Sequence, residues 1–190
     1  MQHDLVVRAQ AGDEAAFASL ADSSIDRLLA IAVNILGDAH LAEDATQQAL
    51  LNMWRQLPRL RDPDRFDAWS YRLVVNACHS EVRHSRRWMP NVLRPLNVDP
   101  ASADEIGVLL DRDQLEVAFR ELSVDHRAVV VLHHYVGLPV ADVATSLEIP
   151  EGTVRSRLYY AMKALRSVLR SPNASSAPVV ADAGISEVHR

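Results

Sequence analysis

Side chains suited to reading a DNA duplex gather on one face of a helix that we expect near the C-terminus. Val154, Leu158, Ala161 and Leu165 recur at helical spacing and form its apolar stripe. The opposite face carries Arg155, Ser156, Tyr159, Tyr160, Lys163 and Arg166. An arginine can donate two parallel hydrogen bonds to the O6 and N7 edge of a guanine. The spacing therefore predicts a helix that could place base-reading groups in a major groove.

A shorter helix directly before this one would brace it. Val140, Val143, Ala144 and Leu147 follow the i, i+3, i+4, i+7 pattern of one helix face. We expect Pro139 and Pro150 at the first positions of the two helices, with the turn between them at residues 148–149. A short helix that braces a basic one is a helix-turn-helix, and we predict one over residues 138–170.

The distribution of charge supports contacts with DNA at two places. The net charge of −5 is unusual for a nucleic-acid binder, but residues 58–95 carry +4 and residues 126–171 carry +3. Residues 1–57 carry −5 and residues 96–125 carry −6. Two basic islands predict two DNA-contacting modules, and the acidic stretches would serve other partners or solubility.

Helical periodicity runs through most of the chain, and no strand pattern appears in the sequence. The helices before the helix-turn-helix are expected at residues 4–10, 13–36, 38–57, 64–87, 111–121 and 125–136. Gly37 and Gly137 would end helices, and Asp38 and Ser123 would cap the ones that follow. Residues 88–106 lose the periodicity and contain three prolines, as a linker does, and the tail from Ser171 is expected to be disordered. We predict an all-α protein of two small helical domains joined by a flexible linker.

Several functions are excluded by what the sequence lacks. Cys78 is the only cysteine, which rules out an intrachain disulfide and fits a reducing cytoplasm. His79 and His84 fall on different helix faces, and their spacing from Cys78 matches no zinc signature. No glycine-rich phosphate loop and no nucleophile with a base appears, so we expect no enzyme, no cofactor and no metal. No apolar run approaches the roughly 18 residues of a membrane span, and the N-terminus is not a signal peptide, which predicts a cytoplasmic protein.

Three motifs occur in an order that resembles a bacterial RNA polymerase sigma factor of the extracytoplasmic-function group, in the sigma-70 superfamily. They are Ala42-Glu-Asp-Ala-Thr-Gln-Gln-Ala49 with Trp54, Phe66-Asp-Ala-Trp-Ser-Tyr-Arg-Leu-Val-Val-Asn76, and Gly152-Thr-Val-Arg-Ser-Arg157. The resemblance covers about residues 4–170. It implies sigma region 2 at residues 1–88, a linker at 89–110, region 4 at 111–171 and a tail at 172–190.

The resemblance implies that the helix from Ala42 to Trp54 docks on core RNA polymerase, through the clamp and flap regions of the large subunits. One face of this helix holds Asp44, Gln47, Gln48 and Leu51. A polar face with a central apolar residue suits a partner, and the alternative is a face that is merely solvated. Gln48 stands where the family usually has a glutamate, so one charged contact is expected to be weaker.

The resemblance also implies that residues 58–87 recognise the −10 element of promoter DNA. The residues assigned to this contact are Arg59, Arg61, Arg65, Phe66, Arg72, Asn76, Arg83, Arg86 and Arg87. Arginines would bind phosphates, Asn76 could pair with a base edge, and Phe66 is a candidate stacking wall. However, Phe66, Trp69 and Leu73 also follow the 3–4 spacing of a core face, which is the default interpretation for all three.

For the −35 element the resemblance implies base contacts from Thr153, Arg155, Ser156, Tyr159 and Tyr160. Arg157, Lys163 and Arg166 would lie nearer the backbone of the DNA. Many relatives carry arginine where this chain has Tyr160, which would alter the sequence read or remove a phosphate contact. Arg157 flanks the apolar stripe, so bracing the scaffold is an equal alternative for it.

Two other classes of protein would explain less of the sequence than a sigma factor does. Another helix-turn-helix protein, such as a repressor, would explain residues 138–170 but not residues 42–76. A helical adaptor that never touches DNA would leave both basic islands without a purpose. We therefore expect an initiation factor that binds core RNA polymerase and promoter DNA, and the sequence leaves open whether an anti-sigma factor is a further partner.

Overall fold

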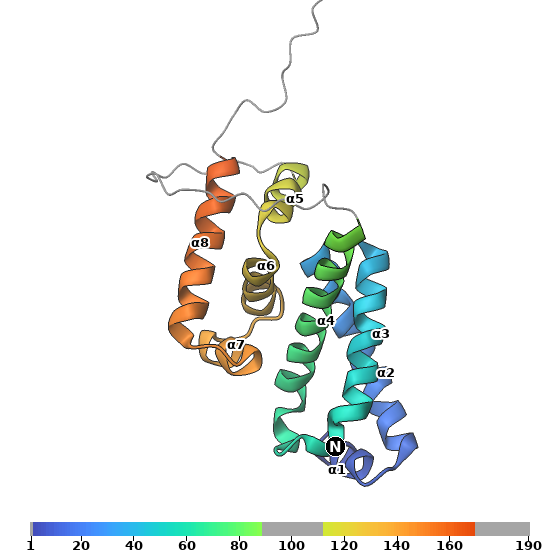
Figure 1. The fold of residues 1–190 in the computed structure, drawn as a ribbon. Coiled ribbons are helices and arrows are strands. Elements are labelled where there is room, and N and C mark those ends of the chain that lie inside the picture. The colour runs from blue at the N-terminus through green and yellow to red at the C-terminus, as the bar shows by residue number, and fades with distance from the viewer. Residues whose placement is uncertain (1, 89–111, 170–190) are drawn as a thin grey trace, which may run out of the picture.

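The computed structural model describes residues 2–88 and 112–169, and within these ranges the side chains of residues 86–88, 112–116 and 168–169 are not described. The first part of the chain forms α1 (Gln2–Gln10), α2 (Glu14–Leu36), α3 (Ala39–Gln56) and α4 (Phe66–Trp88), with short 3₁₀ turns η1 (Leu57–Arg59) and η2 (Pro63–Arg65). The second part forms α5 (Arg112–Glu121), α6 (Val124–Val130), η3 (Val131–Tyr135), α7 (Val140–Leu147) and α8 (Glu151–Leu169). No strand occurs in these ranges, which confirms the predicted all-α class (Figure 1). The predicted linker at 89–110 and tail at 172–190 lie outside the described residues.

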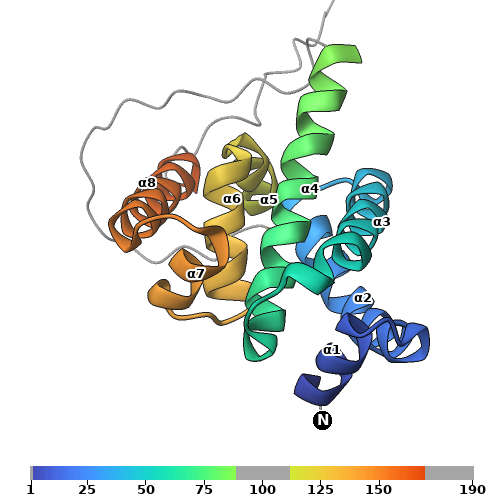
Figure 2. The same ribbon diagram turned by 60° about the horizontal axis from the view of Figure 1, so that its bottom comes forward.

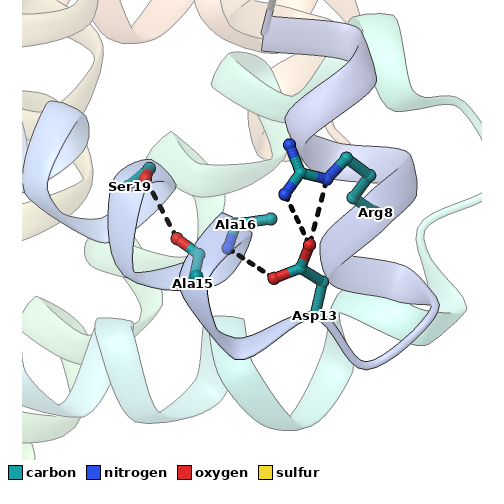
Figure 3. Close-up of polar contacts among 5 residues, drawn as sticks. All are labelled: Arg8, Asp13, Ala15, Ala16 and Ser19. Atoms are coloured by element: carbon teal, nitrogen blue, oxygen red, sulfur yellow. Dashed lines mark hydrogen bonds and ion pairs between the residues drawn. The ribbon is translucent and has the colours of Figure 1, made fainter.

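A capped corner joins α1 to α2 (Figure 3). Asp13 accepts a hydrogen bond from the backbone N–H of Ala16 at 3.0 Å, which satisfies one of the unpaired donors at the start of α2. Its other carboxylate oxygen accepts from Arg8 Nε at 3.0 Å and from Nη2 at 2.6 Å. The Ala16 N–H, followed by the Arg8 guanidinium, lowers the pKa of Asp13. One carboxylate thus fixes the angle between two helices.

The boundary predicted between α2 and α3 is confirmed, both where α2 ends and where α3 begins. Gly37 has a φ of 69° and closes α2 with its N–H bonded to the carbonyl of Val33, a left-handed geometry that favours glycine. Asp38 then caps α3 by accepting from the N–H of Leu41 at 3.0 Å. Because α2 and α3 follow each other so closely, they pack as antiparallel neighbours and receive α4 against both.

The core of the first domain lies between α2, α3 and α4. Leu28, Ile31 and Met53 are fully buried there. The core interpretation of Phe66, Trp69 and Leu73 is confirmed, since they are 1 %, 8 % and 4 % exposed. Cys78 is also completely buried, and its burial raises the pKa of the thiol to about 12, so it is a structural thiol as predicted.

The second domain contains the predicted helix-turn-helix, with two corrections at its boundaries. Pro139 is the N-cap of α7, and the carbonyl of Pro150 accepts from the N–H of Thr153 and Val154 just before α8 begins. Each proline therefore lies one position earlier than predicted, because its carbonyl can start a helix as well as its ring can occupy the first turn. Val143, Val154 and Ala161 are buried, as the apolar stripes require.

The sequence predicted a single α-helix before the helix-turn-helix, and this prediction is wrong. The helix changes at Val131 into the π-helical turn η3, in which the N–H of Val136 donates to the carbonyl of Val131, five residues earlier. Ser123 caps the start of α6, as expected, through a bond from the N–H of His126 at 3.3 Å.

The two domains pack against each other rather than lying apart. α7 and α6 contact α4, and α6 with η3 contacts α2 (Figures 1 and 2). Val124, Leu132 and Val143 of the second domain belong to the same buried cluster as the core of the first. Nothing in the periodicity of the sequence predicted this contact.

Candidate nucleic-acid interface

The side chains on the outer face of α8 are exposed to solvent. The sequence predicted this exposure, because the apolar stripe lies on the opposite face of the helix. Arg155 and Ser156 are exposed, and Tyr159 and Tyr160 are 62 % and 52 % exposed. The two tyrosine rings meet edge to face with their centroids 5.4 Å apart. Such rings expose both apolar faces and hydroxyl groups, which suits contact with bases and sugars.

The start of α8 holds its arginine along the helix surface. Arg155 Nη2 lies 2.5 Å from Glu151 Oε2, one helical turn earlier, and both side chains are largely exposed. Ser156 donates to the carbonyl of Thr153 at 3.0 Å. The carboxylate of Glu151 therefore competes with a DNA base or phosphate for the guanidinium of Arg155.

Arg157 points back into the protein. Its Nη2 lies 3.0 Å from Asp125 Oδ1, and 27 % of its side chain is exposed. This pair ties α8 to the start of α6, so the structure favours the bracing alternative for Arg157 over contact with the DNA backbone. Burial, followed by the nearby charge of Arg157, lowers the pKa of His126. Thr153 and Lys163 are half-buried, and Arg166 is exposed.

Four arginines of the first basic island are brought together around one pocket. The pocket has a volume of about 410 Å³ and takes side chains from the loop before α4, from α4 itself and from the end of α7. Its lining residues are Arg59, Leu60, Arg61, Asp62, Arg65, Ala68, Trp69, Arg72, Thr145, Ser146 and Glu148. Arg65 also forms an ion pair with Asp62 at 3.2 Å. A pocket of this size, with cationic walls and an indole at its edge, can accept a base and its phosphate.

The remaining residues assigned to −10 contacts lie elsewhere. Asn76 and Arg83 are exposed further along α4, whereas the side chains of Arg86 and Arg87 lie outside those described. Phe66 is 1 % exposed, with its ring centroid 6.0 Å from that of Trp69. The stacking role predicted for Phe66 does not fit this position, because the ring fills the core beneath the pocket. Trp69, which the sequence assigned to the core, is the aromatic side chain that lines the pocket.

The predicted polymerase-docking face of α3 is exposed. Asp44 and Gln47 are exposed, Leu51 is 50 % exposed, and Gln48 is half-buried and donates to Asn52 at 3.3 Å. The opposite face of α3, with Ala45, Ala49 and Met53, is buried against the bundle.

Trp54 extends this face beyond the four residues that the sequence analysis assigned to it. It is 44 % exposed and rests edge-on against Phe17 of α2, with ring centroids 4.7 Å apart. A half-exposed tryptophan supported by a second ring is typical of an interface anchor. The spacing alone could not reveal it, because Trp54 lies at the border between the two faces.

The described residues offer little for other chemistry. Within residues 2–88 and 112–169, no group of three histidine, cysteine or acidic side chains could hold a metal ion. None of the helices in these ranges combines the length and apolar character that a bilayer crossing needs.

A helical bundle with an arginine-lined pocket, joined to a helix-turn-helix with an open basic face, defines a two-domain DNA-binding protein of transcription. The family models for sigma-70 region 2 and sigma-70 region 4 match residues 20–88 and 112–165. The chain belongs to the sigma-70 family and, within it, to the extracytoplasmic-function sigma factors. Such a factor directs promoter recognition and transcription initiation together with core RNA polymerase, and it is not an enzyme.

The relatives span nearly the whole chain. The ECF RNA polymerase sigma factor SigL of Mycobacterium tuberculosis is 35 % identical over 85 % of this chain and 93 % of its own length. The ECF sigma factor SigW of Bacillus subtilis is 25 % identical over 84 % of this chain and 91 % of its own. Among solved structures, the sigma factor RpoE of Bartonella quintana, crystallised with the anti-sigma factor NepR, has a TM-score of 0.62 at 22 % identity over 83 % of this chain and 98 % of its own. That likeness supports the fold.

Proposed function

We propose that the two domains divide promoter recognition between them. Residues 1–88 would bind core polymerase and the −10 element, and residues 111–171 would read the −35 element. The observation that carries the proposal is the open polar face of α8, which occurs in the same molecule as the arginine-lined pocket at the start of α4. The segment 89–110 would act as the linker between the two.

In the second domain, Arg155 would read a base edge. It lies in the first turns of α8 on the exposed side, where a recognition helix approaches the groove floor. Thr153, Ser156, Tyr159 and Tyr160 would surround it. Arg166 and Lys163 lie two turns or more further along and would contact phosphates. Arg157 would hold α8 on α6 through Asp125 instead.

In the first domain, the pocket would hold a base extruded from the opened −10 strand. Arg59, Arg61, Arg65 and Arg72 would bind the phosphates on either side of that base. Trp69 would offer the stacking edge in place of Phe66, which would support it from the core. Asn76, Arg83, Arg86 and Arg87 would continue the contact along α4.

The partner surface would be the exposed face of α3. Asp44, Gln47, Gln48 and Leu51 would dock on core polymerase, with Trp54 as an additional anchor. The factor would act in the cytoplasm, where the polymerase and the chromosome lie. The sigma factor RpoE, which shares this fold, was solved with the anti-sigma factor NepR, and we propose an anti-sigma factor as a partner of this chain too.

Run-off transcription with core polymerase over a genomic promoter library tests the proposal. We expect the chain to direct transcription from a set of promoters that share a −35 and a −10 sequence. Arg155→Ala should shift or weaken the −35 preference, and Arg61→Ala should lower transcription without changing that preference. Asp22→Ala, which removes an exposed charge of α2 outside the DNA and polymerase surfaces, serves as the control. Transcription that does not depend on added chain would contradict the proposal.

A further inference from the structure

Helix α1 is bonded to the backbone of the loop that carries several of the arginines assigned to the −10 strand. We propose that α1, through the side chain of Gln10, positions this arginine loop (residues 57–65) for recognition of the −10 element. Gln10 acts as a positioning residue, because its hydrogen bonds go to the backbone of the loop. The inference rests on the proposed function of the pocket that the loop lines.

Gln10 donates two hydrogen bonds to the arginine loop. Its Nε2 atom lies 3.0 Å from the carbonyl oxygen of Leu57 and 2.7 Å from that of Leu60. A primary amide carries two hydrogens, so one side chain can serve both acceptors. Leu57 begins η1, and Leu60 follows it outside the repeating hydrogen bonds of a helix, so the Leu60 carbonyl needs a donor from elsewhere in the chain. Gln10 therefore holds the turn at both of its ends.

The two arginines next to Leu60 depend on the backbone for their position. Arg59 directly precedes Leu60 and Arg61 directly follows it, and both line the pocket with exposed side chains. Among the residues that the structure describes, neither guanidinium forms an ion pair with an acid. The backbone that Gln10 holds at Leu60 therefore determines where Arg59 and Arg61 stand relative to a DNA strand.

One face of α1 spans the whole arginine loop. His3, Val6 and Gln10 follow the i, i+3, i+7 spacing of a single helix face. Val6 is fully buried, and His3 Nδ1 lies 2.8 Å from Asp64 Oδ1 in η2. Seven residues of helix rise by about 10 Å, so α1 contacts η1 at one end and η2 at the other. Figures 1 and 2 show α1 at the end of the bundle where α4 begins.

Helix α1 is itself fixed to the rest of the first domain. The contact between Arg8 and Asp13 sets its angle with α2, and Ala9 is buried in the core. Gln2 Nε2 donates to Asp67 Oδ1 at 2.9 Å, which ties the first turn of α1 to the first turn of α4. A side chain that positions another group has to stand on a rigid element, and α1 meets this requirement.

The support from Gln10 reduces what DNA binding has to organise. Without the amide, both carbonyls would turn to water, and the segment with Arg59 and Arg61 could adopt several conformations. A DNA strand would then have to order the loop as it binds, which lowers the affinity. The preference between bases would fall too, because a loop that adapts to each base discriminates less between them.

Base selectivity in the complex with core polymerase tests the role of Gln10. Gln10→Met keeps the length of the side chain and removes both donors. We expect the affinity for a fluorescent single strand with the non-template −10 sequence to fall about three- to tenfold. The preference for this strand over strands with single-base changes in the −10 element should fall as well. A general loss of stability would not change a preference between bases, so the second measurement separates positioning from folding.

Two variants serve as controls. Gln2→Met makes the same chemical change on α1 but leaves both loop carbonyls bonded. Asp38→Ala removes the cap at the far end of α3 and lowers stability without a change in the loop. Both should keep the selectivity of the parent chain. In the free chain, nitrogen-15 relaxation of the Arg61 backbone amide should show greater mobility in Gln10→Met but not in either control.

Arg61→Ala separates this inference from the proposed function. If Arg61→Ala binds the −10 strand as tightly as the parent chain does, the −10 assignment of the pocket fails, and the role of Gln10 in recognition fails with it. If Arg61→Ala weakens binding while Gln10→Met keeps the affinity and selectivity of the parent chain, only the positioning role is wrong. An equal loss of selectivity in either control, or an Arg61 amide that is no more mobile in Gln10→Met, would also overturn that role.

Discussion

Arg155 illustrates how much the role of a residue depends on its immediate neighbour. Its guanidinium is exposed on the side of α8 that we propose to read a base edge, and it is paired with Glu151 at 2.5 Å. This exposed pair on one helix contributes little to stability. Its effect is on recognition, because binding to a base must replace the carboxylate. The net preference of Arg155 for a guanine is therefore the difference between two partners.

We predict that Arg155→Ala and Arg166→Ala will have different effects on −35 DNA. Arg155→Ala should cost about 1–3 kcal/mol on the preferred sequence and flatten the preference at one base pair. Arg166→Ala should weaken all sequences alike and reduce the salt dependence by about one charge. Affinities for single-base variants of the −35 element, measured at several salt concentrations, distinguish the two. The orientation of α8 would be wrong if the two effects were exchanged.

Two histidines should make the stability of the chain depend on pH. Burial lowers the pKa of His79, against the opposing effect of Asp125, and burial followed by the charge of Arg157 lowers that of His126. Between the lowered pKa and the ordinary 6.5, the unfolded chain binds more protons than the folded one. The contribution of these groups is therefore fully present above about pH 6.5 and is lost as the pH falls below it.

Urea unfolding at pH 7.5 and pH 5.5 checks this prediction. The free energy of unfolding should decrease at the lower pH, and the double variant His79→Gln, His126→Gln should lose less of it over the same interval. His3→Gln is the matched control, because His3 is exposed and pairs with Asp64 at the surface. An equal pH dependence in the parent and the double variant would show that these two residues are not responsible.

At the scale of the elements, the cap of α3 connects stability with docking. Asp38 accepts from the N–H of Leu41, and α3 then presents the proposed polymerase face. Asp38→Ala should destabilise the protein by about 1 kcal/mol, whereas Asp38→Asn, which can still accept that bond, should cost only a fraction of this amount. Urea unfolding at pH 7 measures both. Equal losses would indicate that the charge of Asp38, rather than the hydrogen bond, stabilises the helix.

The face of α3 should also contribute directly to the affinity for core polymerase. Replacing both Asp44 and Gln47 by alanine should weaken binding by about 1–3 kcal/mol while the chain remains folded, as expected for a few contact residues at an interface. Asp22→Ala is the control, since Asp22 is an exposed acid on another helix, α2, and is not part of this face. A competition assay against labelled chain gives the affinities, and unchanged values for the double variant would remove α3 as the docking element.

Most of the helices could be predicted from the sequence, because local signals determine them. Gly37 and Asp38 mark one boundary, and Ser123 marks another, through backbone bonds made within a few residues. The π-helical turn at Val131–Tyr135 gave no such signal. It continues the apolar pattern of α6, and Leu132 within it is buried in the core that the two domains share.

The site was predictable in its residue types but less so in its geometry. Helical spacing correctly predicted that Arg155 and Tyr159 are exposed and that Val154 is buried. Spacing could not show that Trp69, rather than Phe66, reaches the pocket, because both lie on the same stripe and only the position of the preceding loop separates them. Nor could it show that Arg157 would pair with Asp125, which comes from another helix.

At the scale of the whole molecule, the separation of charge along the sequence becomes a set of contacts in space. An acid from the first turn of α6, Asp125, and one from the turn after α7, Glu148, meet basic groups of α8 and α4. Arg72, which we propose as a phosphate contact, is thus already paired with an acid of the chain. If the pocket binds DNA as proposed, a phosphate would have to compete with Glu148 for Arg72.

The competition leads to a prediction about salt. Exposed and half-exposed ion pairs are screened as the ionic strength rises, because the Debye length falls from about 10 Å at 0.1 M to about 3 Å at 1 M. With spin labels at Arg55→Cys on α3 and Ser167→Cys on α8, both at exposed positions, the population with longer distances between the labels should therefore grow as salt is added in the absence of DNA. The buried apolar contacts of Val124, Leu132 and Val143 do not weaken in this way, so the increase should be partial.

Glu148→Asn provides the reference for that experiment. Since the variant has already lost the pair with Arg72, its distances should start longer and should respond less to salt than those of the parent chain. Binding to duplex promoter DNA should still weaken with salt in both proteins, because released counterions dominate that equilibrium. The contact between the two domains would owe nothing to the ion pair if the parent and the variant showed the same salt response in the absence of DNA.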